Sequence, residues 1–202
     1  MIKIGLRIFS YIEKNYYFLY NKIKFRIHGV SILDNTKVNG KFYINNQGKI
    51  SLGKNVYINS SISSNMLGSS SFSSLVSGFN GELYIGNNVG ISNSSITSHQ
   101  RVVIKDNVTI GNGCKIIDTD FHPIGADDRL KNKTEKILMA EIIINENVFI
   151  GTGTIILKGV NIGQNSVIGA HSVVTRSIPS NEIWAGNPAK RIKSLTTIKE
   201  LS

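Results

Sequence analysis

The sequence predicts an all-β solenoid, in which short parallel strands stack as a β-helix. From Ile144 to Thr175, aliphatic residues recur at every sixth position: Ile144, Ile150, Ile156, Ile162, Ile168 and Val174. A second, smaller residue follows four positions after each of the first five: Val148, Thr154, Val160, Ser166 and Ser172. A strand repeats every two residues and a helix every 3.6, so a period of six indicates short strands joined by tight corners, three to a coil.

The same spacing occurs earlier in the chain, with interruptions. It is seen in four shorter runs: Ile32, Val38 and Ile44; Leu52 and Ile58; Ile85 and Ile91; Ile104, Ile110 and Ile116. Residues 63–81 are rich in serine and glycine and lose the period, which indicates a loop or a decorated coil. The longest interruption separates Ile116 from Ile144, and long excursions from a regular scaffold commonly carry function.

Charge is the unusual feature of the composition. The 202 residues have the length of one domain and contain 23 Lys and Arg against 13 Asp and Glu, a net charge of +10. This favours an anionic partner, which could be nucleic acid, a membrane surface or a phosphate-bearing small molecule. The single cysteine, Cys114, occupies a core position of the repeat, so we expect no internal disulfide and a cytoplasmic location. We also expect no membrane span and no secretory signal.

Residues 1–28 differ from the rest of the chain. They are aromatic and basic, with six Lys or Arg against Glu13 alone, and Ile4, Ile8 and Ile12 recur at helical spacing. We therefore predict one or two amphipathic helices. Such a segment could cap the open end of the solenoid, and it could also attach to an anionic membrane surface. Binding of nucleic acid is not expected, because no recognisable motif accompanies the basic residues.

Three segments follow from these patterns. Residues 1–28 form a basic helical segment, residues 29–182 the β-helix with an active-site loop at 117–143, and residues 183–202 a C-terminal tail. The tail is placed there because Pro179 and Pro188 argue against continued coil stacking.

Four motifs carry a resemblance to a known family. They are D-T-D-F-H-P-I at 118–124, N-V-F-I-G-T-G-T-I-I-L-K-G-V-N-I-G at 147–163, V-I-G-A-H-S-V-V-T-R-S-I-P at 167–179, and A-G-N-P-A-K at 185–190. The chain resembles the hexapeptide-repeat, left-handed β-helix acyltransferases. Within them it is similar to the galactoside, maltose and nodulation-factor O-acetyltransferases, and most similar to those acting on capsular or O-antigen polysaccharide. The resemblance implies a left-handed coil, acetyl-CoA as co-substrate, no metal, and a homotrimer with active sites between subunits.

His122 is the candidate general base. A sugar hydroxyl is a poor nucleophile while protonated, and an imidazole can accept its proton near neutral pH. His122 lies in the longest break of the repeat, and the resemblance implies the same role. Asp120 or Asp118 could hold its second ring nitrogen, or the two carboxylates could instead fix the turn. The resemblance also implies that the backbone N–H of Thr152, after Gly151, meets the thioester oxyanion.

Further positions follow from the resemblance. CoA-binding residues are expected at Gly151, Thr152, Ala170, Thr175, Arg176, Lys190 and Lys193, where the cations could pair with phosphates. Asn93 and His99 are candidate contacts of the acceptor, although His99 could be a corner residue without function.

The sequence thus predicts an acetyl-CoA-dependent O-acetyltransferase that modifies a sugar hydroxyl in surface polysaccharide biosynthesis. An N-acetyltransferase acting on an amino sugar nucleotide stays open, because its base and CoA groove would look alike. A non-catalytic β-helix scaffold is the alternative of another class. A zinc site is not expected, because His99, His122 and His171 do not have the close spacing of zinc ligands.

Overall fold

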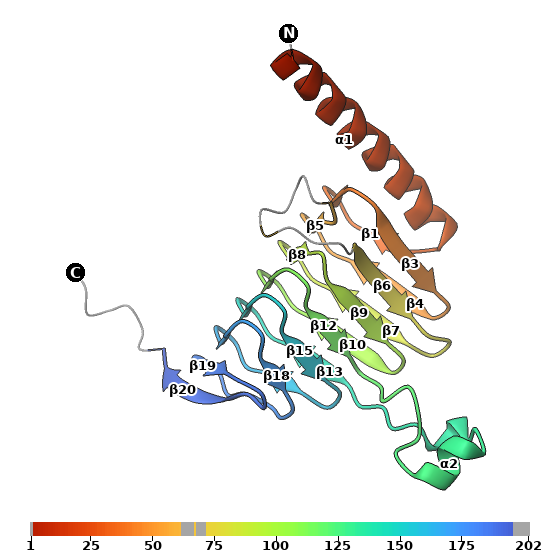
Figure 1. The fold of residues 1–202 in the computed structure, drawn as a ribbon, viewed down its shortest axis with the longest axis vertical. Coiled ribbons are helices and arrows are strands. Elements are labelled where there is room, and N and C mark those ends of the chain that lie inside the picture. The colour runs from red at the N-terminus through yellow and green to blue at the C-terminus, as the bar shows by residue number, and fades with distance from the viewer. Residues whose placement is uncertain (1, 62–66, 68–71, 196–202) are drawn as a thin grey trace.

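The computed structural model describes residues 2–61, 67 and 72–195, with side chains from residue 15 onward. The described strands form three sheets, the faces of an elongated stack (Figure 1). Sheet A contains β1 (Ser31–Ile32), β4 (Lys49–Leu52), β7 (Glu82–Ile85), β10 (Arg101–Ile104), β13 (Ile142–Ile144) and β16 (Asn161–Ile162). Sheet B contains β2 (Lys37–Asn39), β5 (Tyr57–Asn59), β8 (Gly90–Ser92), β11 (Thr109–Ile110), β14 (Phe149–Ile150), β17 (Val167–Ile168), β19 (Glu182–Ala185) and β20 (Lys190–Ser194). Sheet C contains β3 (Phe42–Asn46), β6 (Ser73–Ser77), β9 (Ser95–Ser98), β12 (Lys115–Ile117), β15 (Ile155–Leu157) and β18 (Val173–Val174).

Each coil takes one strand from sheets A, B and C in turn, and equivalent strands of neighbouring coils pair in parallel. β13, β14 and β15 form one coil, and β16, β17 and β18 form the next. The register pairs the six-step residues, Ile144 with Ile162, Ile150 with Ile168 and Ile156 with Val174. All of these side chains are buried, so the predicted parallel β-helix is confirmed, with one aliphatic side chain per face in the core.

Asparagines occupy the corner between sheets A and B, which we call corner AB. Six of them have φ between 56° and 61°: Asn55, Asn88, Asn107, Asn147, Asn165 and Asn181. Asparagine tolerates this left-handed conformation better than most residues because its short side chain can form local hydrogen bonds. Each side-chain amide except that of Asn181, the last, donates to the carboxamide oxygen of the next asparagine in the stack, at 2.8–3.1 Å. The repeated asparagines therefore form a ladder that joins six successive coils.

A single helix, α1 (Ile2–Ile27), covers the first coil. The Asn21 amide donates to the carbonyls of Val38 and Gly40, at 3.3 and 3.0 Å, and the Phe25 ring packs 5.6 Å from that of Phe42. The N-terminal part of the helix extends away from the stack (Figure 1). The capping interpretation is therefore the one that these contacts support. Among the described helices, none has the length and apolar character that a membrane span requires.

The serine-rich segment is partly a regular coil. Its described end contains β6, which pairs in parallel with β3 and β9. Inward positions of this strand hold Ser73, Leu75 and Ser77, all buried. The aliphatic period is lost here because serine replaces aliphatic residues inside the prism. Of the two interpretations, the coil is therefore the one that holds for residues 73–77 and the loop is wrong there, while residues 62–66 and 68–71 lie outside the described part of the chain.

The coil continues beyond the boundary expected at residue 182. β19 pairs in parallel with β17, aligning Ile183 with Val167 and Trp184 with Ile168. After Pro188 the chain returns as β20, which pairs with β19 in antiparallel fashion. Pro179 does not prevent stacking because it lies at a corner, between the bridge residue Ile178 and β19. The expected tail is thus a hairpin on the last coil as far as the structure describes it.

Candidate active site

The expected site residues lie at two corners of the prism. Corner BC, between sheets B and C, holds Asn93, Gly151, Thr152 and Ala170, because each follows a sheet B strand. Corner CA, between sheets C and A, holds His99, Asp118, Asp120, His122, Thr175 and Arg176, because each follows a sheet C strand. One chain therefore places the candidate base and the candidate oxyanion donor on different edges of the stack.

The active-site loop leaves the stack at corner CA. It projects outward between β12 and β13 and contains α2 (Ala126–Leu130) and the 3-10 turn η2 (Thr134–Lys136) (Figure 1). Its two ends form a short antiparallel stem, in which Thr119 pairs with Met139. The Asp120 N–H donates to the Leu138 carbonyl and the Ala140 N–H to the Asp118 carbonyl, each at 3.0 Å. The loop thus starts and ends on a hydrogen-bonded base.

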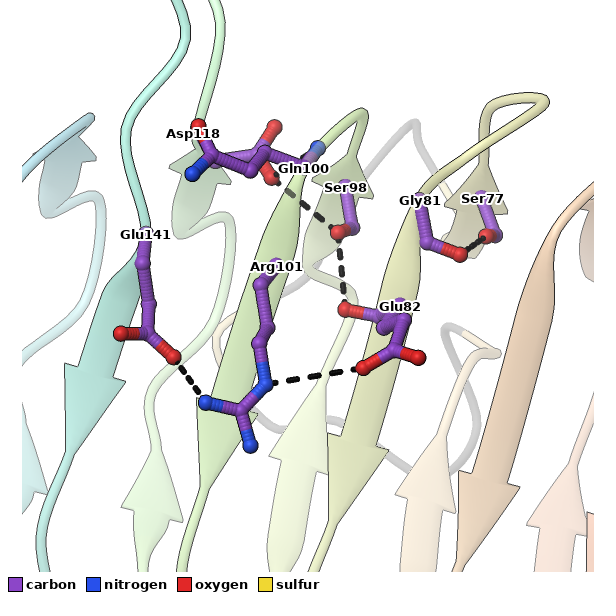
Figure 2. Close-up of polar contacts among 8 residues, drawn as sticks. All are labelled: Ser77, Gly81, Glu82, Ser98, Gln100, Arg101, Asp118 and Glu141. Atoms are coloured by element: carbon purple, nitrogen blue, oxygen red, sulfur yellow. Dashed lines mark hydrogen bonds and ion pairs between the residues drawn. The ribbon is translucent and has the colours of Figure 1, made fainter.

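Asp118 is fully buried and fixes the turn of the preceding coil. Its carboxylate accepts from the Ser98 hydroxyl at 3.1 Å (Figure 2). It also accepts from the backbone N–H groups of His99 and Gln100, at 2.7 and 2.9 Å. These three donors favour the turn-fixing alternative for Asp118. Of the two carboxylates considered as partners of His122, Asp120 is therefore the one that remains.

Asp120 is held by a lysine that sequence reasoning missed. The Lys158 ammonium lies 2.6 Å from Asp120 Oδ1, and the two side chains are 27% and 26% exposed. The other carboxylate oxygen, Oδ2, is buried and has no hydrogen-bond partner among the described residues. Aligning the coils with the loop removed sets Lys158 level with the start of the D-T-D motif, because Ile117 pairs with Leu157, but it does not single out Asp120 as the partner.

The backbone before His122 has an unusual conformation. Phe121 has φ of 59°, and its N–H donates to the Thr119 hydroxyl at 3.2 Å. A non-glycine residue in this region costs about 1–3 kcal/mol and commonly marks a functional turn. The Phe121 ring packs edge-on against His99, with 5.7 Å between centroids, so the structure brings His99 to the loop. His122 itself is exposed and has no polar partner among the described residues.

Corner BC offers a backbone donor. The Thr152 N–H has no acceptor among the described residues, while the Thr152 carbonyl accepts from the His171 N–H at 2.7 Å. A Cβ at Gly111 would lie 2.6 Å from the Thr152 nitrogen, and one at Gly151 would lie 2.6 Å from the Ala170 nitrogen. The stacked corners thus keep the backbones of successive coils close together at Gly111, Gly151 and Ala170.

Asn93 does not fit its expected role as an acceptor contact. It is 2% exposed, and neither polar atom of its side chain reaches the surface or finds a partner among the described residues. Its N–H donates to Asn59 and its carbonyl accepts from Gly113, so stacking holds it inside corner BC. In this chain, Asn93 presents no side-chain atom to an acceptor.

Two of the expected CoA cations lie on the terminal hairpin. Lys190 and Lys193 of β20 are exposed and have no ionic partner among the described residues. Arg191 between them pairs with Glu182 at 2.7 Å. Lys190 and Lys193 thus remain available for phosphate.

Thr175 and Arg176 are exposed on the last coil. The Arg176 guanidinium lies 5.6 Å from the Trp184 ring. Trp184 is 8% exposed, stacks on Ile168 of the preceding coil, and donates Nε1–H to Glu182 on its own strand. This donor and the Arg191 charge lower the pKa of the Glu182 carboxyl.

Known proteins share the repeat. Residues 141–176 match the family model described as bacterial transferase hexapeptide (six repeats). A putative acetyltransferase of Saccharomyces cerevisiae is 42% identical over 119 residues, covering 58% of this chain and 59% of that protein. The galactoside O-acetyltransferase of Escherichia coli is 36% identical over 118 residues, covering 58% and 56%. The matches thus span little more than half the length of these curated relatives.

The fold is also shared. A galactoside acetyltransferase solved in complex with coenzyme A superposes with a TM-score of 0.55 at 28% identity, covering 82% of this chain and 65% of that one. The expected left-handed β-helix, with a helical segment at its start and a long loop between coils, is therefore confirmed. In its repeat, in these relatives and in its fold, the chain is similar to the hexapeptide-repeat transferases.

Proposed function

We propose that the chain is an acetyl-CoA-dependent O-acetyltransferase that modifies a sugar hydroxyl in surface polysaccharide, either capsule or O-antigen. The observation that carries the proposal is the presence on this fold of two groups, an exposed loop histidine, His122, and a backbone donor without an acceptor among the described residues, Thr152 N–H. The similarity to galactoside O-acetyltransferases supports a sugar hydroxyl as the acceptor.

Each group has a step in the transfer. His122 removes the proton from the acceptor hydroxyl as its oxygen attacks the thioester carbonyl. The Thr152 N–H stabilises the negative charge that develops on the carbonyl oxygen. The intermediate then expels the CoA thiolate, which takes up the proton, and the acetyl group is left on the sugar. Asp120 is the carboxylate nearest in sequence that could hold the second nitrogen of His122.

Transfer is direct, without an acyl-enzyme. The lone thiol, Cys114, is 1% exposed and bonds to the Gly151 carbonyl at 3.2 Å inside the prism. Burial raises the pKa of this thiol, which keeps it in the protonated, unreactive form at neutral pH. No cysteine nucleophile is therefore assigned.

The complete site forms between copies of the chain in a homotrimer. His122 and Thr152 occupy different corners, so a groove between neighbouring prisms would bring corner CA of one copy to corner BC of the next. Acetyl-CoA lies in this groove, with its pantetheine arm along Gly151, Thr152 and Ala170. Its phosphates meet the cations at the C-terminal end, Arg176, Lys190 and Lys193, beside Thr175.

The acceptor reaches the enzyme at an anionic membrane surface. The outward side of α1 carries an apolar stripe, opposite the residues that contact the coil, formed by Tyr16, Leu19, Tyr20, Ile23 and Ile27. All five are more than two-fifths exposed. Lys22 and Arg26 lie along one border of the stripe, and residues 1–28 carry six cations against one anion. Such a face suits peripheral contact with anionic lipid, where a lipid-linked saccharide would be found.

The test is release of thiol from acetyl-CoA with a panel of sugars, nucleotide sugars and polysaccharide repeat units. Acceptor-dependent release is expected for the wild type. In His122→Ala the rate should fall by about 10² to 10⁴, the range that general base catalysis contributes. His28→Ala is the matched control, because His28 directly follows α1, which covers the first coil, and should keep the wild-type rate.

The remaining outcomes would each correct one part of the proposal: the acceptor atom, the base or the activity itself. Product analysis that finds an amide instead of an ester would establish N-transfer to an amino sugar. Equal rates for His122→Ala and wild type would remove His122 from the mechanism. Failure to release thiol together with failure to bind CoA would leave a β-helix scaffold.

A further inference from the structure

The two carboxylates of the D-T-D motif tie the active-site loop to two different coils. Asp118 bonds to the turn at 98–100, in the coil before the loop. Asp120 bonds to Lys158, in the coil after it. The chain leaves the stack between these two attachments, and His122 follows two residues later. The motif therefore anchors the start of the loop from both sides.

Lys158 belongs to a second point of support for the same stem. It follows β15 at corner CA, and the neighbouring Gly159 donates its N–H to the Ala140 carbonyl at 3.1 Å. Ala140 in turn donates to the Asp118 carbonyl across the stem. The turn at 158–159 thus holds both strands of the stem, one through an ion pair and the other through a backbone hydrogen bond.

The position of His122 depends on this stem because its own side chain has no polar partner among the described residues. Only Phe121, with its positive φ, separates it from Asp120. A carboxylate released from Lys158 would be left partly buried with both oxygens unpaired, since Oδ2 already lacks a partner among the described residues. It would then turn toward water and carry the backbone of the stem with it.

We propose that Lys158 is a positioning residue for the transferase: by holding Asp120, it sets the place and orientation of the His122 imidazole. The inference rests on the proposed function for its kinetic consequence, whereas the geometry of the stem stands without it. Lys158 touches neither acceptor nor CoA in this role and acts through Asp120 alone.

The experiment compares Lys158→Met, Lys158→Arg and a matched control, Lys133→Met. Lys133 forms a similar ion pair with Asp128 at 3.0 Å, but on the exposed outer part of the same loop. Lys158→Met should lower kcat by about tenfold or more, because small displacements of a catalytic group are costly. The KM for acetyl-CoA should stay within about twofold, since the stem is not expected to touch CoA. Lys158→Arg should recover most of kcat, and Lys133→Met should match the wild type.

A second readout does not require activity. The chain has four histidines, so imidazole NMR signals can be assigned by single substitutions. Lys158→Met should shift or broaden the His122 signal and speed hydrogen exchange at the Asp120 amide, with neither change in Lys133→Met. Asp120→Asn should give a similar result, and the double variant should be no worse than either single variant.

The two proposals fail in different ways. A wild type without transferase activity, but with the expected NMR changes, would overturn the proposed function and keep the role of Lys158 in the stem. An active wild type whose kcat is unchanged in Lys158→Met would overturn the inference alone. A loss that Lys158→Arg does not repair would also overturn it. If Lys158→Met does not fold, Lys158→Gln replaces it in the same comparison.

Discussion

Single residues at the corners determine much of this fold. Asparagine recurs at corner AB because the corner needs a left-handed backbone, and the stacked carboxamides hydrogen-bond to one another. Glycine serves elsewhere for a different reason. At Gly151 and Gly163 a Cβ would lie 2.6 Å and 2.3 Å from a backbone nitrogen of the next coil. Local conformation and close stacking therefore select different residues at different positions, and corner AB contains both kinds, Gly163 and Asn165.

At this scale Asn107 gives a prediction for stability. Asn107→Ala should destabilise the protein by about 1–2 kcal/mol, because alanine in the left-handed region pays that cost and the two ladder bonds are lost. Asn107→Gly should cost less, because glycine removes the backbone strain while losing the same bonds. Thermal unfolding at one fixed protein concentration measures both. Equal losses for the two variants would show that the ladder bonds, and not the backbone, determine the effect.

Among the elements, α1 stands out because it has two opposite apolar faces. One face packs Phe25 on the first coil, and the other leaves the stripe from Tyr16 to Ile27 uncovered in this chain. A helix that only capped the solenoid would need the first face alone. The second face is the element-scale basis for the proposed membrane contact.

The prediction for α1 concerns binding to lipid vesicles. The wild type should float with vesicles that contain phosphatidylglycerol and should bind much less to neutral phosphatidylcholine vesicles. The double variant Leu19→Glu, Ile23→Glu should lose this binding, because it places charge on the face that enters the lipid. Phe79→Glu is the control, since Phe79 is 83% exposed but distant from α1 in the sequence and should not change binding. Retained binding by the α1 variant would contradict the proposal, and a changed oligomeric state would instead assign the stripe to contacts between copies.

For the whole molecule, the prism geometry determines how a complete site can arise. Stacking keeps residues of one corner in line along the edge, so it gathers His99, Asp120 and Lys158 from distant parts of the chain. The same stacking keeps Thr152 on another edge. A second copy is therefore needed for a site that uses His122 and Thr152 together.

Mixed assemblies test this arrangement. The protein should have the mass of three 22.2 kDa chains in solution. His122→Ala and Ala170→Trp, which fills the proposed pantetheine channel, should each be inactive alone. When the two variants are refolded together in equal amounts, about a quarter of the shared sites should pair two intact halves, by random association in a closed ring. No recovery of activity would indicate a site formed within one chain.

The sequence determined the solenoid and the place of its main loop. Period six specifies the β-helix because each aliphatic side chain must fill one face of a narrow prism, and this rule is local. The interruption of this period at 117–143 also pointed to His122, although the catalytic role of His122 remains a proposal. The rule failed at residues 73–77, where serine fills the core positions, and at β19, which continues the stack past Pro179.

Only the tertiary structure decided which partners the polar residues have. The partner of Asp120, Lys158, lies 38 residues away, and one donor to Asp118, Ser98, lies 20 residues away. Nothing in the spacing of D-T-D-F-H assigns the two carboxylates to different coils. Likewise, Asn93 was placed inside its corner and Thr152 on a different edge from His122. The physical reason is that the stacking of whole coils determines which side chains meet in a solenoid. The loop at 117–143 interrupts the six-residue period, so the period alone does not show which residues beyond the loop stack on those before it.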